Sequence, residues 1–355
     1  MTPEFGDGTR VVHAFAGEAG DPFGAQPVFA SAYHLGGQDY YGRAGNPTWR
    51  ALESALGALE GGECVVFPSG MAAISTLLRT VLSTGDTLVI PSDGYFLTRK
   101  FVSEMDVTVR EVPTAGPYPS LDGVKLVLLE TPSNPGLDVC GIADLAERAH
   151  AAGALLAVDN TTATPLGQRP IELGADVVVA SDTKAVAGHS DVLFGHVTLA
   201  SPELAGRLRD ARTLNGAIPG PFETWLALRG LGTLDLRLAR QAENAAAIHA
   251  LLKGRIEGLR WPGAPEDPAH PVAARQMRRF NGVLTFVLED KAAVDEFLAR
   301  SRLVSAATSF GGLHSTADRR AQFGDPVPEG LVRFSAGCED TRDLVADVSQ
   351  ALGLD

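Results

Sequence analysis

Residues 177–195 read "VVVASDTKAVAGHSDVLFG" and contain Lys184, one of five lysines in a chain of 355 residues. The stretch begins with an apolar run, 177–180, that is typical of a buried strand. It continues through small and apolar residues, among which a charge is costly to bury. Lysines are mostly exposed, so a surface loop is the ordinary interpretation of Lys184. The sequence on either side favours another interpretation.

Short apolar runs alternate with helical patterns throughout the sequence before Lys184. The runs lie at residues 64–67, 87–90, 107–112, 126–130, 155–159 and 177–180. Apolar residues recur at helical spacing from about residue 48 to the Gly61-Gly62 pair, and again at residues 71–81. Strands that alternate with helices predict an α/β fold with a mostly parallel central sheet and helices on both faces.

The sequence after Lys184 predicts a second, smaller α/β unit. Residues 222–252 have the pattern of one or two long helices, with Arg237, Arg240 and Glu243 on the polar side. Strands are expected within residues 281–290, 303–312 and 331–337, and a closing helix at residues 341–354. A chain of this length exceeds the usual size of a single core, so a large domain and a smaller one are expected.

Composition and spacing exclude several classes of protein. A net charge of −13 argues against binding to nucleic acid, which requires clustered Lys and Arg. The three cysteines and the histidines lack the spacing of a disulfide framework or a metal site, so we expect no catalytic metal. No signal-peptide pattern and no apolar stretch of about eighteen residues occurs. We expect a soluble, cytoplasmic protein that does not bind membranes.

Ligands of an open parallel sheet bind beyond the carboxyl ends of its strands. The segments that follow the predicted strands are 69–71, 93–95, 131–135, 159–161 and 181–184. The turn at Ser69-Gly70-Met71 opens a helix, whose free backbone N–H groups can hold a phosphate. Asp159 is either a helix cap or a binding carboxylate, and Tyr95 is either a packing or a stacking aromatic. Together with Lys184, these residues indicate pyridoxal 5'-phosphate (PLP), which needs a Schiff-base lysine, an acid, a phosphate site and a stacking face.

Four longer stretches carry a family resemblance. They are "YGRAGNPTWRALESALGALEGGECVVFPSGMAAI" (41–74), "LLETPSNPGLDV" (128–139), "AVDNTTATPLGQRPIELGADVVVASDTKAVAGHSDV" (157–192) and "LVRFSAGCEDTRDLVADV" (331–348). From about residue 26 to its end, the sequence resembles the Cys/Met-metabolism family of PLP-dependent enzymes. The resemblance implies the PLP-dependent transferase fold of type I. We therefore expect an N-terminal arm at residues 1–35, a PLP-binding domain at 36–238 and a C-terminal α/β domain at 239–355.

The resemblance also implies a role for each residue that matches a family motif. Lys184 is the expected catalytic lysine that binds PLP, and Asp159 is the partner of the ring nitrogen. Tyr95 is expected to stack on the ring and to move a proton during catalysis. The remaining cofactor contacts implied by the resemblance are Gly70, Met71, Ser181 and Thr183 for the phosphate and Asn134 for the phenolic oxygen.

Other matches imply substrate contacts and a subunit partner. Arg333 matches the arginine that clamps the substrate α-carboxylate, for which a planar guanidinium is suited, and Ser309 and Asn134 are expected to assist it. Tyr41 and Arg43 match residues that reach the cofactor phosphate of a neighbouring subunit. The resemblance therefore implies a homodimer with shared active sites, which in this family is usually paired into a tetramer.

The sequence departs from the family pattern in three places around the substrate. Phe96-Leu97 follows the stacking tyrosine, where the family commonly has Gly-Gly. His314 stands where lyases and synthases commonly have a glutamate that holds the distal amino group of cystathionine, so we assign His314 to substrate binding. Residues 315–330, "STADRRAQFGDPVPEG", replace a longer family segment with a shorter loop, basic at first and then acidic.

The expected activity is that of a cystathionine γ-lyase, which forms cysteine, 2-oxobutyrate and ammonia. The short loop and the stretches "SDGY" and "GAIPGP" resemble short bacterial enzymes of that activity. The open alternatives are a cystathionine γ-synthase, an O-acylhomoserine sulfhydrylase, or another sulfur amino-acid lyase such as a methionine γ-lyase. A dinucleotide-dependent dehydrogenase would need a GxGxxG turn, which is missing. A non-catalytic relative is disfavoured because Lys184, Asp159 and Arg333 are all present.

Overall fold

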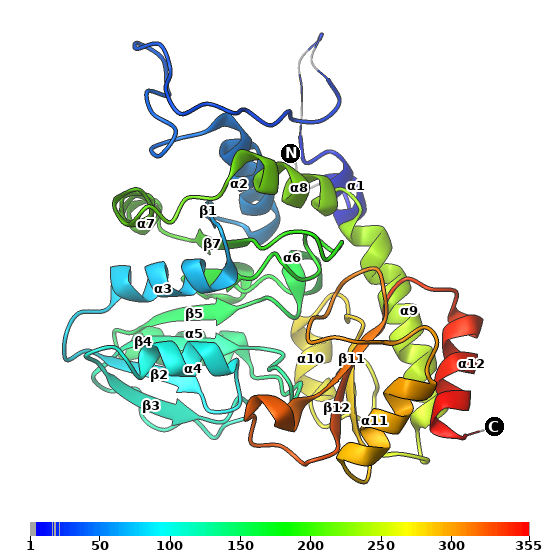
Figure 1. Ribbon diagram of the computed structural model, residues 1–355. Helices are drawn as coiled ribbons and strands as arrows, with labels where there is room; N and C mark the ends of the chain where they lie inside the picture. The colour runs from blue at the N-terminus through cyan, green and yellow to red at the C-terminus, as the bar shows by residue number, and fades with distance from the viewer. Residues whose placement is uncertain (1–4, 16, 18, 21, 355) are drawn as a thin grey trace.

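A computed structural model describes residues 5–15, 17, 19–20 and 22–354 of the chain. Figure 1 shows two units, a larger one built on a seven-stranded sheet and a smaller one built on a five-stranded sheet. The chain is therefore an α/β protein with a second, smaller sheet domain, as predicted. No helix in the described part of the chain is long and apolar enough to cross a membrane.

The larger sheet has the strand order β1-β7-β6-β5-β4-β2-β3. Its strands are β1 (Glu63–Phe67), β2 (Thr87–Pro91), β3 (Thr108–Val112), β4 (Val124–Glu130), β5 (Leu155–Asp159), β6 (Val177–Ala180) and β7 (Gly195–Leu199). Strands β3, β2, β4, β5 and β6 pair in parallel, whereas β7 is antiparallel to both β1 and β6. All six predicted strands are present. The prediction missed β7, because His196 and Thr198 interrupt its apolar pattern although both are buried.

Helices cover both faces of this sheet, because its strands are apolar on both sides. Val65 and Phe67 of β1 pack on one face with α3 (Gly70–Val81) and α7 (Pro202–Asn215). Cys64 and Val66 pack on the opposite face with α2 (Pro47–Glu60) and α8 (Pro221–Leu231). The short helices α4 (Phe96–Val102) and α6 (Thr164–Gly167) and helix α5 (Ile142–Ala151) complete the unit.

The smaller sheet has the order β10-β11-β12-β9-β8. Its strands are β8 (Glu257–Arg260), β9 (Val283–Val287), β10 (Ser305–Ala306), β11 (Thr316–Arg319) and β12 (Leu331–Ser335). Its helices are α9 (Leu234–Leu252), α10 (His270–Gln276), α11 (Lys291–Arg300) and α12 (Thr341–Leu352), and a 3-10 turn, η2 (Arg320–Phe323), follows β11. The start of α9 packs in the core of the larger unit and its end in the core of the smaller one. The predicted domain limits stay predictions. They place the PLP-binding domain at 36–238 and the C-terminal domain at 239–355.

Two details of the sequence-based prediction were wrong. Arg237 does not lie on a polar face, because it is buried and donates hydrogen bonds to the carbonyl oxygens of Ala185, Val186 and Gly230. The strand expected within residues 303–312 is only the two-residue β10.

The arm expected at residues 1–35 is described except for residues 1–4, 16, 18 and 21. It contains a short helix, α1 (Asp7–Val12), whose Val11 is buried in the core shared with α9. The rest of the described arm has no helix or strand. At least this turn of helix therefore packs within its own chain, and the limits of the arm stay a prediction.

Candidate active site

A pocket of about 340 Å³ opens where β4, β5 and β6 end, between the larger and the smaller unit. Nine residues singled out from the sequence line it: Gly70, Met71, Tyr95, Asn134, Asp159, Ser181, Thr183, Lys184 and Arg333. The larger unit contributes all of these except Arg333, which comes from β12 of the smaller unit. The pocket therefore brings together residues that are up to 263 positions apart in the sequence.

Four other residues that the sequence singled out do not line this pocket. Ser309 lies next to it and its Oγ accepts a hydrogen bond from Lys184 Nζ at 3.1 Å. His314 is exposed. Tyr41 is 43% exposed, and the guanidinium carbon of Arg43 lies 5.1 Å from the centre of its ring. The roles expected for these four residues stay predictions.

One side of the pocket is formed by the N-terminus of α3 and by Ser181. Ser69 caps the helix, with its Oγ accepting a hydrogen bond from the N–H of Ala72 at 3.1 Å. A Cβ atom at Gly70 would lie 2.7 Å from the Cβ of Ser181, so only glycine allows the two segments to approach this closely. Free backbone N–H groups and hydroxyls at a helix N-terminus favour a bound anion such as a phosphate.

Buried ionisable side chains contact the loop from Ser181 to Lys184. Asp182 does not line the pocket, and its carboxylate lies 2.8 Å from Nδ1 of His196, whose Nε2 is 3.7 Å from Glu60. All three side chains are fully buried. Burial opposes the charge on His196, but Asp182 and Glu60 together raise its pKa to about 10. The contact between Asp182 and His196 therefore ties the loop that carries Lys184 to strand β7.

A pair of acids lies at the ends of two neighbouring strands. Glu130 of β4 and Asp159 of β5 are partners in register. Burial raises the pKa of both carboxyl groups, and the charge of Asp159 raises that of Glu130 further. Glu130 also accepts hydrogen bonds from the N–H of Tyr95 at 2.6 Å and of Asn134 at 2.8 Å. Sequence reasoning missed Glu130, although an acid that ends an apolar strand was a usable signal.

The amine of Lys184 is partly buried, which lowers its pKa to about 8, with a further contribution from the positive charge of Arg333. Its Nζ lies 5.3 Å from the centre of the Phe310 ring. A lysine in such surroundings is partly neutral near physiological pH, and the neutral amine is the form that acts as a nucleophile or a base.

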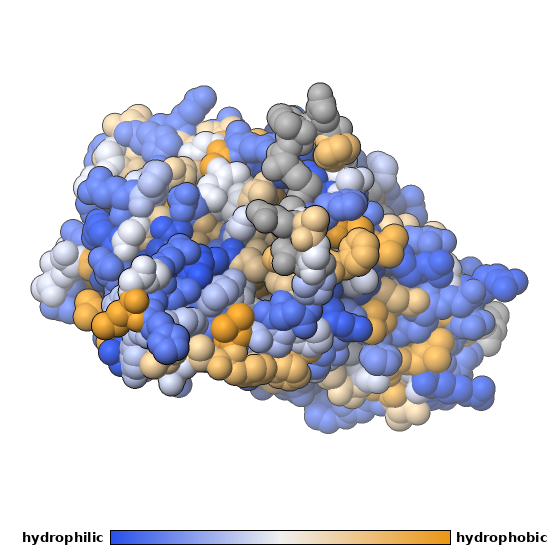
Figure 2. All heavy atoms as spheres, turned by 90° about the horizontal axis from the view of Figure 1, so that it is seen from above, coloured by the Kyte–Doolittle hydropathy of each residue, from blue (hydrophilic) through white to orange (hydrophobic). Residues whose placement is uncertain are grey.

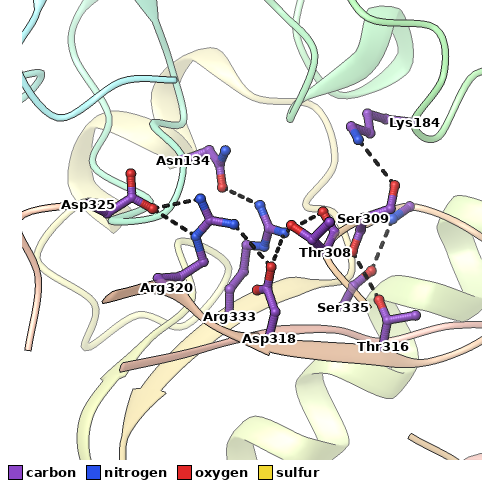
Figure 3. A network of polar contacts seen from close by, with 11 residues as sticks. Asn134, Lys184, Thr308, Ser309, Thr316, Asp318, Arg320, Asp325, Arg333 and Ser335 are labelled. Atoms are coloured by element: carbon purple, nitrogen blue, oxygen red, sulfur yellow. Dashed lines mark hydrogen bonds and ion pairs between the residues drawn. The ribbon is translucent and has the colours of Figure 1, made fainter. Parts of the chain in front are cut away.

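A cluster of arginines and aspartates forms the floor of the pocket on the side of the smaller unit (Figure 3). Arg333 donates to Asn134 Oδ1 at 2.7 Å, to the carbonyl oxygen of Thr308 at 3.0 Å and to Asp318 Oδ2 at 2.9 Å. Arg320 also lines the pocket. Sequence reasoning missed Arg320, because whether this side chain reaches the pocket depends on the path that loop 315–330 takes.

Comparison with known proteins shows to which family the chain belongs. The family model of the Cys/Met metabolism PLP-dependent enzymes matches residues 28–353. The chain belongs to this family. A Streptomyces coelicolor protein named "Putative cystathionine gamma-lyase" is 51% identical over 98% of the chain and 93% of its own length. The cystathionine gamma-synthase of Mycobacterium tuberculosis (strain H37Rv) is 38% identical over 98% and 97%.

Solved structures of the family have the same fold. The cystathionine gamma synthase of Xanthomonas oryzae pv. oryzae in complex with cystathionine superimposes with a TM-score of 0.94 at 36% identity. The match covers 99% of this chain and 98% of that one. The type I fold expected from the sequence is therefore confirmed, and the cofactor of the family is PLP.

The pocket fits PLP by the chemistry of its side chains. Lys184 offers an amine of lowered pKa, and Asp159 offers a partly buried carboxylate beside Glu130. The helix N-terminus at Gly70 provides a cradle for a phosphate. We infer that Lys184 holds the cofactor covalently, that Asp159 pairs with the ring nitrogen and that Tyr95 stacks on the ring. We propose that Gly70, Met71, Ser181 and Thr183 would hold the phosphate and that Asn134 would contact the phenolic oxygen.

The lowered pKa of Lys184 predicts how fast apoprotein binds PLP covalently at each pH. Only the neutral amine reacts, so the rate should rise with pH around a midpoint of about 8 instead of the ordinary 10.5. Arg333→Gln removes a positive charge that lowers this pKa, so the midpoint should move to higher pH. Time courses of cofactor absorbance between pH 6 and 10 would measure both midpoints.

The exposed Arg342 offers a matched control, since Arg342→Gln removes the same charge at a side chain that is 93% exposed. Its midpoint should equal that of the wild type. A wild-type midpoint near 10.5, or a shift of Arg333→Gln to lower pH, would contradict the electrostatic account.

Proposed function

We propose that the chain is a cystathionine γ-lyase that converts L-cystathionine and one water molecule to cysteine, 2-oxobutyrate and ammonia. The observation that carries the proposal is the set of groups that share the pocket. The lysine amine lines it together with the Glu130–Asp159 pair, suited to a ring nitrogen, and the guanidinium of Arg333, suited to an α-carboxylate. The identity of 51% to a protein named for this activity favours a lyase over other members of the family.

Bound PLP supplies an electron sink for the charge that remains at Cα when its proton is removed. In the proposed mechanism, Arg333 holds the α-carboxylate and thereby directs the Cα–H bond toward Lys184. The neutral amine of Lys184 takes the proton from Cα and, once it has passed that proton on and is neutral again, takes a proton from Cβ. Burial and the charge of Glu130 raise the pKa of Tyr95, so its hydroxyl stays protonated and can give a proton to the departing sulfur. The Cγ–S bond breaks, and the sulfur leaves as cysteine.

A second candidate function is the synthesis of cystathionine from an activated homoserine. The identity of 38% to a cystathionine gamma-synthase, and the close superposition on another, favour this alternative. A sulfhydrylase or a methionine γ-lyase would use the same cofactor residues. In each case the lysine and Arg333 keep the same roles, and the group that leaves or enters at Cγ differs.

The deciding experiment incubates PLP-loaded protein with L-cystathionine alone and identifies the products by mass. Cysteine with 2-oxobutyrate is the expected result. Homocysteine with pyruvate would mean cleavage on the other side of the sulfur. If cystathionine is not consumed, the same protein is given O-succinylhomoserine or O-acetylhomoserine together with cysteine or with sulfide. A thioether formed from cysteine would identify a synthase, and a thiol amino acid formed from sulfide would identify a sulfhydrylase.

We also propose that the chain forms homodimers with shared active sites, and tetramers made from them. Large apolar side chains of the arm are exposed, with Phe23 fully exposed and Leu35 86% exposed. Figure 2 shows the molecule from above, the side of the arm and α8, with apolar side chains spread among hydrophilic ones. A second subunit would cover the exposed arm and bring Tyr41 and Arg43 to the neighbouring phosphate site.

Shared sites predict that two inactive variants restore activity when their subunits mix. Arg43→Ala and Lys184→Ala should each be nearly inactive alone. A hybrid dimer has one site with both residues intact, so random exchange should restore about one quarter of wild-type activity. Activity after joint unfolding and refolding would test this. No recovery despite hybrid dimers detected by mass would show that Arg43 acts within its own subunit.

A further inference from the structure

Arg320 lies in the shortened loop 315–330, which the proposed mechanism does not use. It is 3% exposed and lines the same pocket as Arg333, which is 4% exposed. Figure 3 shows the two guanidinium groups side by side, with Asn134 above them. A second buried guanidinium in a substrate pocket is costly unless it is paired, so its contacts indicate its purpose.

Two aspartates and an aromatic ring fix the orientation of Arg320. Asp325 Oδ2 accepts hydrogen bonds from its Nε at 2.9 Å and its Nη2 at 2.6 Å, and Asp318 Oδ2 accepts from its Nη1 at 3.0 Å. The ring of Phe323 lies 4.8 Å from the guanidinium carbon. A guanidinium has five N–H groups, so one on Nη1 and one on Nη2 remain for a ligand.

The free donors of Arg333 do not form the fork that its expected role uses. Its Nη2 already donates to the Thr308 carbonyl oxygen and to Asp318 Oδ2, and its Nη1 donates to Asn134. Each of the two forks by which a guanidinium grips a carboxylate includes Nη2. With both N–H groups of Nη2 engaged, Arg333 alone offers a carboxylate no complete fork.

The two arginines are coupled through one atom. Asp318 Oδ2 accepts from both guanidinium groups, so Arg320 and Arg333 are separated by a single carboxylate oxygen. Asp318 Oδ1 is buried and has no hydrogen-bond partner in the described part of the chain. The two positive charges of Arg320 and Arg333 equal in number the two negative charges of Asp318 and Asp325. Arg333 keeps two free N–H groups, on Nε and Nη1, and a carboxylate that enters beside it finds the two free N–H groups of Arg320 in the same pocket.

We propose that Arg320 is a second carboxylate-binding residue of the pocket, which completes the donor set that Arg333 leaves unfilled. This role rests on the proposed function, because it takes the substrate to be a sulfur amino acid. The carboxylate is either the α-carboxylate, common to all such substrates, or the second carboxylate that cystathionine carries and methionine lacks.

The test compares three ligands that differ in their number of carboxylates: L-methioninamide with none, L-methionine with one and L-cystathionine with two. Dissociation constants for PLP-loaded wild type and Arg320→Gln are measured by rapid mixing from the cofactor absorbance, before product forms. Loss of one charge-assisted hydrogen bond should weaken carboxylate ligands about tenfold or more and leave the amide unchanged. Weaker binding of both amino acids assigns Arg320 to the α-carboxylate. Weaker binding of cystathionine alone assigns it to the second carboxylate.

Arg319 is the matched control, because it is the next residue, carries the same charge and pairs with the exposed Glu329 outside the pocket. Arg319→Gln should bind all three ligands as the wild type does. If Arg320→Gln fails to fold or to load PLP, Arg320→Lys keeps the charge and serves for the same comparison. Equal weakening for all three ligands, or none, would overturn the role of Arg320. Wild-type protein that binds none of them would overturn the proposed function and this role with it.

Discussion

Lys184→Ala should abolish turnover of cystathionine and remove the visible absorbance of covalently bound PLP. Lys184 is the only lysine among the described residues that line the pocket. Alanine offers neither the amine that holds the cofactor nor the base that moves protons at Cα and Cβ. General acid–base catalysis alone contributes about 10²–10⁴-fold, so the loss of kcat should be at least about 10³-fold. Absorbance spectra of the purified protein and steady-state rates would measure both effects.

Lys291→Ala is a suitable control for this variant, because Lys291 is exposed and, among the described residues, its ion pair is with Asp295 on its own helix. It should keep the spectrum and the rate of the wild type. Retention of both absorbance and turnover in Lys184→Ala would refute the assignment of Lys184. Loss of absorbance with turnover retained would mean that cofactor bound without a covalent link suffices, which would refute the proposed proton transfers by its amine.

The strands of the larger sheet were predictable because parallel strands are buried on both faces. Residues such as Val177, Val178 and Val179 then form uninterrupted apolar runs that stand out from helical patterns. Strand β7 did not stand out, since it contains the buried His196, whose charge Asp182 and Glu60 favour. That compensation depends on residues from three distant segments, and no local pattern reveals it.

The cofactor side of the pocket was predictable for a related reason. Residues that follow parallel strands meet at one edge of the sheet, so Asp159 and Lys184 were expected near each other and both line the pocket. The substrate side depends on loops of the smaller unit. Arg320 reaches the pocket through the path of loop 315–330 and its pairing with Asp318 and Asp325, which has no signature in the sequence.

Arg333→Lys should lower kcat/KM for cystathionine by about 10²-fold, mostly through a higher KM. Lysine keeps the positive charge but lacks the planar arrangement of donors, so at least one charge-assisted hydrogen bond to the α-carboxylate is lost. The carboxylate is bound equally before and during the reaction, and loss of such uniform binding raises KM more than it lowers kcat. Steady-state kinetics of cystathionine cleavage, with Arg319→Lys as the control, would measure the change.

The same variant separates the charge of Arg333 from its shape. Because lysine preserves the charge beside Lys184, the midpoint for covalent binding of PLP should stay near pH 8, whereas Arg333→Gln should raise it. A higher KM at an unchanged midpoint would therefore assign substrate binding to the guanidinium geometry, and the pKa of Lys184 partly to the charge. A fall in kcat with no change in KM would contradict α-carboxylate binding by Arg333, and would instead indicate that the residue acts on the reacting atoms through Lys184.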